Sequence, residues 1–197
     1  MRHILAVALL ALGMLLAPVG ASAQTTVELI AADIDAWWAA VFAERGLAYS
    51  SPRLDQVDEP GIEFCAGIDV FYTPAGYCFT NNTVFFSTLF ASPDSLVWLP
   101  VISHEWGHHI QGLTDTGVGS LLESELQADC FSGAFVAAAA DADWISPVIA
   151  SQALQLTQSA GDVWFELPFE EQVHGNKAER ALAFMTGMNG GLAACGI

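Results

Sequence analysis

Residues 104–112 read HEWGHHIQG, and two of the histidines in this stretch are four residues apart. If the stretch is helical, as we expect, His104 and His108 stand one above the other on one face. Glu105 directly follows the first histidine, so its side chain points about 100° away from that of His104 around the helix axis. The spacing therefore predicts two imidazoles that can reach one metal ion, with a carboxylate beside it.

Zinc is the ion that this pattern favours, at one ion per chain. Zn²⁺ binds imidazole nitrogens at about 2 Å and lowers the pKa of a bound water toward about 7. Glu105 could then take the proton of that water as the water attacks a carbonyl carbon. The alternative is that three polar residues lie close together by chance, so the hypothesis requires a third protein ligand.

The third ligand is best sought among the carboxylates of the next predicted helix. No H-x-x-G-x-x-H extension follows the stretch, which excludes the metzincin pattern. His109 points about 100° away from its neighbour, so we expect it to be solvated or to support a ligand. Glu125 and Asp129 are four residues apart, so Glu125 can bind the metal while Asp129 orients a ligating histidine. The alternative is that Glu125 and Asp129 lie on a solvent-exposed face of this helix. The many apolar residues around them argue against a face that is wholly exposed.

Two further polar residues near the end of the chain could take part in catalysis. His174 precedes Gly175 at the start of the last predicted helix. Near the metal it could donate a hydrogen bond to the oxyanion of a tetrahedral intermediate. By spacing alone, a surface histidine that caps a turn is an equally good interpretation. Arg180 could act electrostatically in the same way or pair with a surface acid, which is the more common role.

The first 23 residues are typical of a signal peptide. Arg2 supplies the positive charge, residues 4–19 form an apolar run, and residues 21–23 (ASA) are a cleavage site. An uncleaved membrane anchor is the alternative, but the run is short for a span. We therefore expect an exported protein, secreted or periplasmic, whose mature chain (residues 24–197) is a single domain without a membrane segment.

All four cysteines lie in the predicted mature chain, where two disulfides are the default for an oxidising compartment. Three pairings are possible. We favour a local Cys65–Cys78 bridge and a Cys130–Cys195 bridge that holds the C-terminus. Cysteine ligation of zinc is the weaker interpretation, because no pair has C-x-x-C spacing.

The strong negative charge excludes several classes of partner. The chain carries 22 acidic and 5 basic residues, for a net charge of −17. So few basic residues cannot form a phosphate-binding surface, and an anionic membrane would repel the protein. A peptide or protein substrate is the partner we expect, and the sequence does not determine the oligomeric state.

Hydrophobic periodicity predicts a mostly helical α+β fold with a small antiparallel sheet. The predicted helices share apolar positions at helical spacing. The first lies within residues 26–47, with Gly46 as its C-cap, and the second begins or kinks at Pro100 and ends at Gly112. The others start at Ser120, with Glu123 in a capping box, and at Ser146-Pro147, and the last covers 175–188. The strands are 53–57 and a hairpin over 78–87 that turns at Asn81-Asn82. The aromatic pair of TVFFS is expected in the core.

The stretches HEWGHHIQ, ELQADCFSGAF and HGNKAERALAFMTG, followed by a cysteine near the C-terminus, resemble the bacterial neutral zinc metallopeptidases. The resemblance extends to WWAAVFAERGLAYSSPRL and TVFFSTLF, and so covers nearly all of residues 24–197. It implies a zincin-like domain in which His104, His108 and Glu125 bind zinc and Glu105 is the catalytic base. In such gluzincin-like sites an E-x-x-x-D arrangement supplies a ligand and its support, which matches Glu125 and Asp129. The family's HG-containing segment falls on His174.

Two features depart from the family pattern. Pro100 interrupts the run that leads into HEWGH, and FCAGIDVFYTPAGYCF carries two cysteines where a shorter, single-cysteine turn is expected. Both concern loops near the cleft and leave the proposed ligands in place.

The function that we expect is exported, zinc-dependent hydrolysis of peptide bonds. One alternative is a zinc-binding envelope or interaction protein that turns over no peptide, although zinc binding alone would not require Glu105. Another is a zinc amidase that acts on cell-wall peptides.

Overall fold

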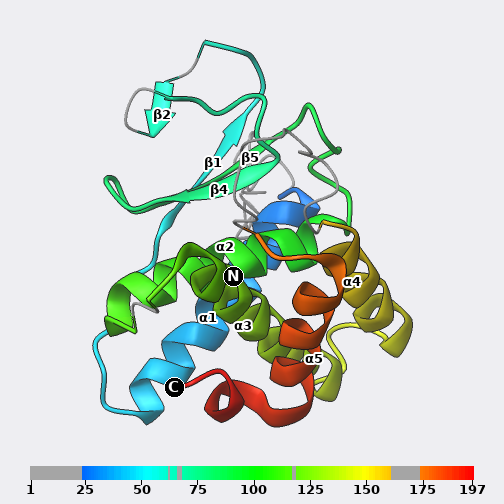
Figure 1. The fold of residues 1–197 in the computed structure, drawn as a ribbon. Coiled ribbons are helices and arrows are strands. Elements are labelled where there is room, and N and C mark those ends of the chain that lie inside the picture. The colour runs from blue at the N-terminus through cyan, green and yellow to red at the C-terminus, as the bar shows by residue number, and fades with distance from the viewer. Residues whose placement is uncertain (1–23, 62, 66–67, 117–118, 161–173) are drawn as a thin grey trace, which may run out of the picture.

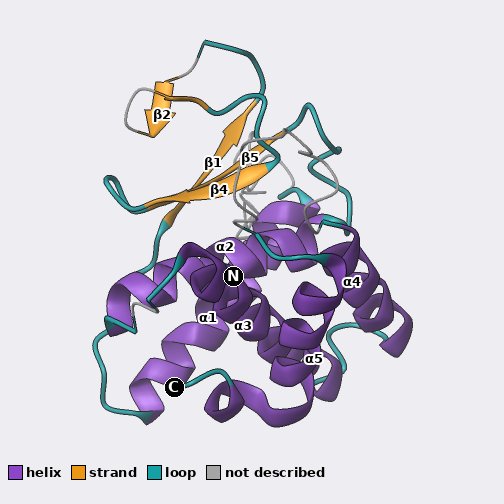
Figure 2. Ribbon diagram, in the orientation of Figure 1, coloured by secondary structure: helices purple, strands orange, loops and turns teal. Residues whose placement is uncertain are grey.

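The computed structural model describes residues 24–61, 63–65, 68–116, 119–160 and 174–197. The predicted signal peptide, residues 1–23, lies outside the described residues. The helices are α1 Thr26–Glu44, α2 Trp98–Thr114, α3 Leu121–Asp141, α4 Pro147–Ser159 and α5 Lys177–Ala194. The strands are β1 Arg53–Val57, β2 Glu63–Cys65, β3 Ile68–Asp69, β4 Ala75–Cys78 and β5 Thr83–Ser87. The fold is therefore α+β and mostly helical, as predicted, with the helices gathered on one side of the sheet (Figures 1 and 2).

The main sheet is mixed, so the prediction of an antiparallel sheet is wrong. Its strand order is β1-β5-β4, in which β4 runs antiparallel to β5 and β1 runs parallel to it. The turn between β4 and β5 makes these two strands antiparallel, because it reverses the chain direction within a few residues. The chain between β1 and β5 is long and includes the β2–β3 hairpin. The local sequence therefore does not determine whether β1 pairs parallel or antiparallel to β5.

The hairpin turns at Asn81-Asn82 as predicted, but its first strand is β4, Ala75–Cys78, and so lies earlier than the predicted range 78–87. Asn82 adopts the left-handed conformation, with φ 53°, and its side-chain oxygen accepts a hydrogen bond from the Tyr77 hydroxyl at 2.9 Å. Every residue of β5 is buried. Phe85 and Phe86 belong to two different apolar clusters, since successive side chains of a strand point to opposite faces.

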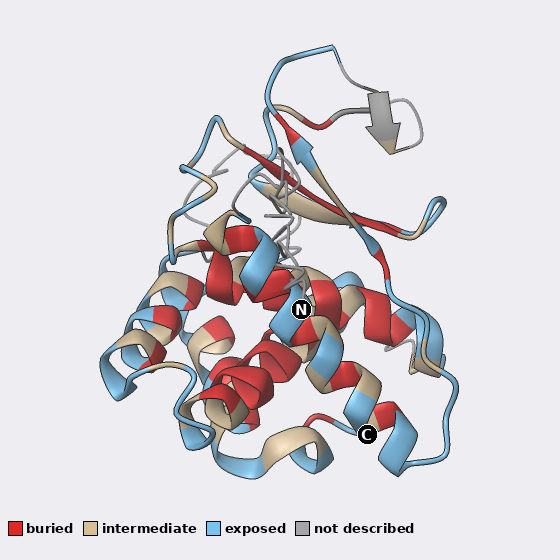
Figure 3. Cartoon of the chain, turned by 180° about the vertical axis from the view of Figure 1, so that it is seen from behind, coloured by how far each residue is buried: buried red, intermediate tan, exposed pale blue. Residues whose placement is uncertain are grey.

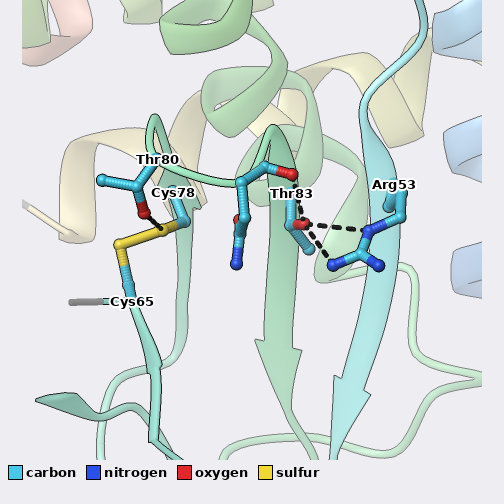
Figure 4. The surroundings of a disulfide bond; sticks show 6 residues. Arg53, Cys65, Cys78, Thr80 and Thr83 are labelled. Carbon is cyan, nitrogen blue, oxygen red and sulfur yellow. Dashed lines mark hydrogen bonds between the residues drawn. A yellow bond between two sulfur atoms is a disulfide. The ribbon is translucent and has the colours of Figure 1, made fainter. Parts of the chain in front are cut away.

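Both predicted disulfides are confirmed. Cys65–Cys78 joins the end of β2 to the end of β4, and the Thr80 hydroxyl lies 3.1 Å from the Cys78 sulfur (Figure 4). At the opposite edge of the sheet in the same view, the Arg53 guanidinium on β1 donates to the Thr83 hydroxyl on β5. Cys130–Cys195 joins the middle of α3 to the end of α5. Two such bonds are typical of a protein that folds in an oxidising compartment.

The predicted starts of α3 and α4 are confirmed. The Ser120 hydroxyl accepts from the backbone N–H of Glu123, and the Ser146 hydroxyl accepts from that of Ile149. The Glu123 side chain accepts a hydrogen bond from the Ser120 hydroxyl at 2.9 Å. Pro147 occupies the first turn of α4, where its missing N–H has no helical partner to lose.

The boundaries of two helices, α2 and α5, differ from prediction. Helix α2 neither begins nor kinks at Pro100, because Pro100 lies in the first turn and the helix starts at Trp98. It also continues past Gly112 to Thr114, and Asp115 ends it in the left-handed conformation. Helix α5 extends beyond residue 188 to Ala194, with a kink at Gly191. Gly112 and the Gly190-Gly191 pair therefore lie within helices and do not end them.

Helix α3 lies against both α2 and α5, and its buried residues line the centre of the helical layer (Figure 3). The contact with α5 uses two glycines on opposite helices. A Cβ atom at Gly133 would collide with the backbone of Phe184, and one at Gly187 with the carbonyl of Cys130. The small residues at this contact therefore permit a close approach of α3 and α5.

None of the helices in the described part of the chain is both long enough and apolar enough to span a bilayer.

We predict that Gly187→Ala destabilises the protein by about 2 kcal/mol or more, because the added methyl group meets backbone atoms that cannot move aside. Gly112→Ala is the matched control, since that glycine lies on an exposed part of α2 with only ordinary contact to Phe79. The control should be neutral or stabilising by up to about 1 kcal/mol. Urea denaturation of both variants measures the difference, and equal midpoints would contradict the close approach.

Candidate metal centre

Helices α2 and α3 cross in close contact at Gly107 and Ala128. A Cβ atom at Gly107 would lie 2.9 Å from the Cα of Ala128, which leaves room only for hydrogen at this position. His104 and His108 are on the same face of α2 as Gly107, and Glu125 lies one turn before the contact on α3. The crossing therefore places the two histidines opposite the glutamate.

The three side chains meet through their terminal atoms. His104 Nε2 lies 3.1 Å from Glu125 Oε2, and His108 Nε2 lies 3.3 Å from Glu125 Oε1. One ligand atom from each residue can be chosen so that all three lie within 4.8 Å of one another. Atoms that bind one metal ion tetrahedrally at about 2.0–2.1 Å lie about 3.3 Å apart. The donor set and its spacing therefore fit a metal ion, which agrees with the grouping that the sequence predicts.

Asp129 supports the first histidine. Its Oδ1 lies 2.8 Å from His104 Nδ1, so an Nδ1–H donates to the carboxylate and Nε2 is the nitrogen that faces Glu125. The Asp129 side chain is only 1% exposed. A carboxylate in this position fixes both the ring orientation and the tautomer of a ligating histidine. The position of Asp129 is the one expected from its spacing to Glu125.

Gln111 supports the second histidine, and the sequence reasoning missed it. Its Oε1 lies 2.9 Å from His108 Nδ1 and also accepts a hydrogen bond from the Ser124 hydroxyl at 2.8 Å. Its amide group donates to the Ser124 carbonyl and to the Gln127 side chain. Gln111 is three residues after His108, a spacing at which helical side chains meet, so this signal was present in the sequence.

Arg180 binds the carboxylate that supports His104. Its Nε and Nη2 donate to the two oxygens of Asp129, each at 2.8 Å, and its Nη1 donates to the carbonyl of Ala160 at 3.0 Å. Arg180 is 7% exposed. Of the two roles that the sequence allows, pairing is therefore observed, but the partner is a buried acid and not a surface one.

The charges of the centre hold its acids in the ionised form. Burial would raise the pKa of Asp129, but hydrogen bonds from Arg180 and the charge of His104 lower it below its usual value. Burial likewise opposes ionisation of Glu125, and contacts with His104 and His108 lower its pKa strongly. Burial lowers the pKa of His104, while Asp129 and Glu125 together raise it to about 10. The ionised carboxylates of Glu125 and Asp129 therefore favour a positive charge at His104.

Glu105 is half-buried on α2, and its side chain makes no hydrogen bond or ion pair with the described part of the chain. The positive charge of Arg180 is close enough to interact with it. A carboxylate placed this way remains available to accept a proton. This arrangement is compatible with the role predicted for Glu105, which stays a prediction.

His174 is not a member of the group formed by His104, His108 and Glu125. Its side chain is exposed, and it precedes Gly175, which packs against Leu122 and Leu126 on α3. A role for His174 at the oxyanion therefore stays a prediction.

His109 is 1% exposed, so the first of its two expected roles, a solvated residue, is wrong. The second role, support of a ligand, is not seen in the hydrogen bonds that its ring makes with the described residues. Its ring lies 2.8 Å from the Ser50 carbonyl and 3.2 Å from the Tyr77 hydroxyl. His109 therefore joins α2 to the hairpin side of the fold and points away from the metal-binding group.

Comparison with known proteins finds no matching family model, no curated relative and no solved structure of similar fold. The relation to zinc metallopeptidases therefore stays a prediction from the motifs of the chain.

We predict that Gln111→Leu weakens metal binding about tenfold, because His108 loses the acceptor that orients its ring. Gln158→Leu makes the same change at an exposed position of α4 and should leave the affinity unchanged. A chelator competition titration with Zn²⁺ measures both dissociation constants. Unchanged binding in Gln111→Leu would show that this contact has no orienting role.

Proposed function

We propose that this protein is an exported, zinc-dependent peptidase of the zincin-like type. The observation that carries the proposal is the convergence of His104, His108 and Glu125 from two helices. Glu105 directly follows His104 in α2. Two imidazoles, one carboxylate and an open fourth position form a donor set typical of catalytic zinc.

The surrounding residues support a catalytic use of this set over a purely structural one. Structural zinc sites are usually closed by four protein ligands, often cysteines. Here the cysteines are paired in disulfides, and the described residues offer three ligands to the ion. The Glu125 side chain is 17% exposed and that of His108 is 12% exposed, so the centre is not sealed from solvent. An accessible three-ligand site leaves room for water and substrate.

The proposed reaction assigns a separate task to each side chain. Bound zinc would supply Lewis-acid polarisation of a water molecule and of the substrate carbonyl. Glu105 would accept a proton from the attacking water and later transfer it to the leaving amine. His104, His108 and Glu125 would hold the ion, while Asp129 and Gln111 keep the two histidine rings in place. His174 would donate a hydrogen bond to the oxyanion if its exposed ring turns toward the substrate.

Export belongs to the same proposal. The apolar N-terminal run and the ASA site predict cleavage before Gln24. The two disulfides agree with an oxidising compartment, which for an exported chain is the periplasm or the medium.

We predict that the wild-type mature protein contains one zinc ion per chain and that Glu125→Ala contains far less, because two histidines alone bind zinc weakly. Metal content by mass spectrometry tests this step. Wild-type protein that takes up no zinc, even on addition of the metal, would contradict the proposed function.

Glu105→Gln should retain zinc and lose at least about a hundredfold in hydrolysis, since an amide cannot act as a general base. Glu123→Gln is the control, because that glutamate lies in the exposed first turn of α3. Digests of a peptide library and of cell-wall peptides distinguish a peptidase from a cell-wall amidase. Zinc binding without hydrolysis of either substrate would favour the non-catalytic alternative.

A further inference from the structure

Arg180 approaches the metal-binding group from a third helix. It lies in the first turn of α5, whereas His104 is on α2 and Asp129 on α3. Its guanidinium holds both oxygens of Asp129 at 2.8 Å, and one of the same oxygens accepts from His104 Nδ1. The three side chains form one buried chain of hydrogen bonds that ends at the nitrogen facing Glu125.

This geometry leaves Asp129 a single orientation. A carboxylate bound at one oxygen can rotate, but a two-pronged guanidinium contact fixes its plane as well as its position. The Ala160 carbonyl holds the third donor group of the guanidinium, so Arg180 itself is fixed at the end of α4. The orientation of His104 therefore depends on the way α5 and α4 pack beside α3.

We infer that Arg180 is a positioning residue for the metal centre, which acts through Asp129 to hold His104 in the orientation that binds the ion. The inference rests on the metal site of the proposed function and extends it to α5. Loss of the guanidinium lets the carboxylate rotate, and the His104 ring then samples orientations in which Nε2 no longer faces Glu125. Metal affinity falls even though no ligand has been removed.

The alternative is that Arg180 only stabilises the fold. Removing one partner of a buried ion pair leaves an uncompensated charge and destabilises a protein whether or not a site is nearby. A stability measurement therefore cannot separate the two roles. The readout has to be metal affinity, compared in the presence and absence of the carboxylate through which Arg180 acts.

The experiment is a double-mutant cycle on the Zn²⁺ dissociation constant of the full mature chain, measured by chelator competition. Arg180→Met should weaken binding at least about tenfold in the wild-type background. In the Asp129→Asn background the same substitution should change binding by less than about twofold, because the route through Asp129 is already broken. Lys177→Met removes an exposed cation from the same helix and should leave the dissociation constant unchanged.

Arg180→Lys provides a second test with less disturbance of folding. Lysine keeps the positive charge but cannot make the two-pronged contact, so zinc binding should lie between wild type and Arg180→Met. The visible spectrum of bound Co²⁺ should shift in both Arg180 variants and stay as in wild type in Lys177→Met, because it reports ligand geometry and not stability.

Two outcomes would overturn the inference. One is zinc binding within twofold of wild type in folded Arg180→Lys and Arg180→Met, and the other is an equal loss in both backgrounds of the cycle. Either result, with normal zinc binding by wild type, contradicts the role of Arg180 alone. Wild-type protein that binds no zinc contradicts the proposed function as well.

Discussion

The close contact between Gly107 on α2 and Ala128 on α3 is the constraint on which the candidate site depends. Helices with larger residues at the contact are separated by side chains, but here a Cβ atom on residue 107 would lie only 2.9 Å from the Cα of Ala128. At this separation, side chains as short as histidine and glutamate can meet across the helices. The glycine within HEWGH therefore has a packing role that the metal-binding pattern alone does not reveal.

The two histidines are supported in different ways. A buried, charged carboxylate holds His104, while a neutral amide that is also bound to polar groups of α3 holds His108. Both lines of support reach α5: Asp129 contacts Arg180, and Gln127 donates to the carbonyl of Cys195. The Cys130–Cys195 bond and the glycine contacts keep α5 against α3. The last helix thus stabilises a centre to which it contributes no ligand.

Much of the architecture could be predicted, because local interactions dominate it. The starts of α3 and α4 follow from a serine that accepts a backbone N–H within one turn. The hairpin follows from an asparagine that tolerates a positive φ. The direction of β1 and the true ends of α2 and α5 could not be predicted. Those features depend on packing between segments that are distant in sequence, and for such packing a Pro or Gly is only a weak guide.

The sequence by itself determined that His104 and His108 share one face of a helix and that Glu125 and Asp129 share one face of another, since helical periodicity is a local property. It also limited the disulfides to three pairings and suggested the two that form. Only the tertiary structure decided that these two faces meet, that Gln111 turns back to His108, and that Arg180 binds Asp129 and not a surface acid. Each of these contacts joins elements whose relative positions are set by the burial of the whole core, which no single segment of the chain encodes.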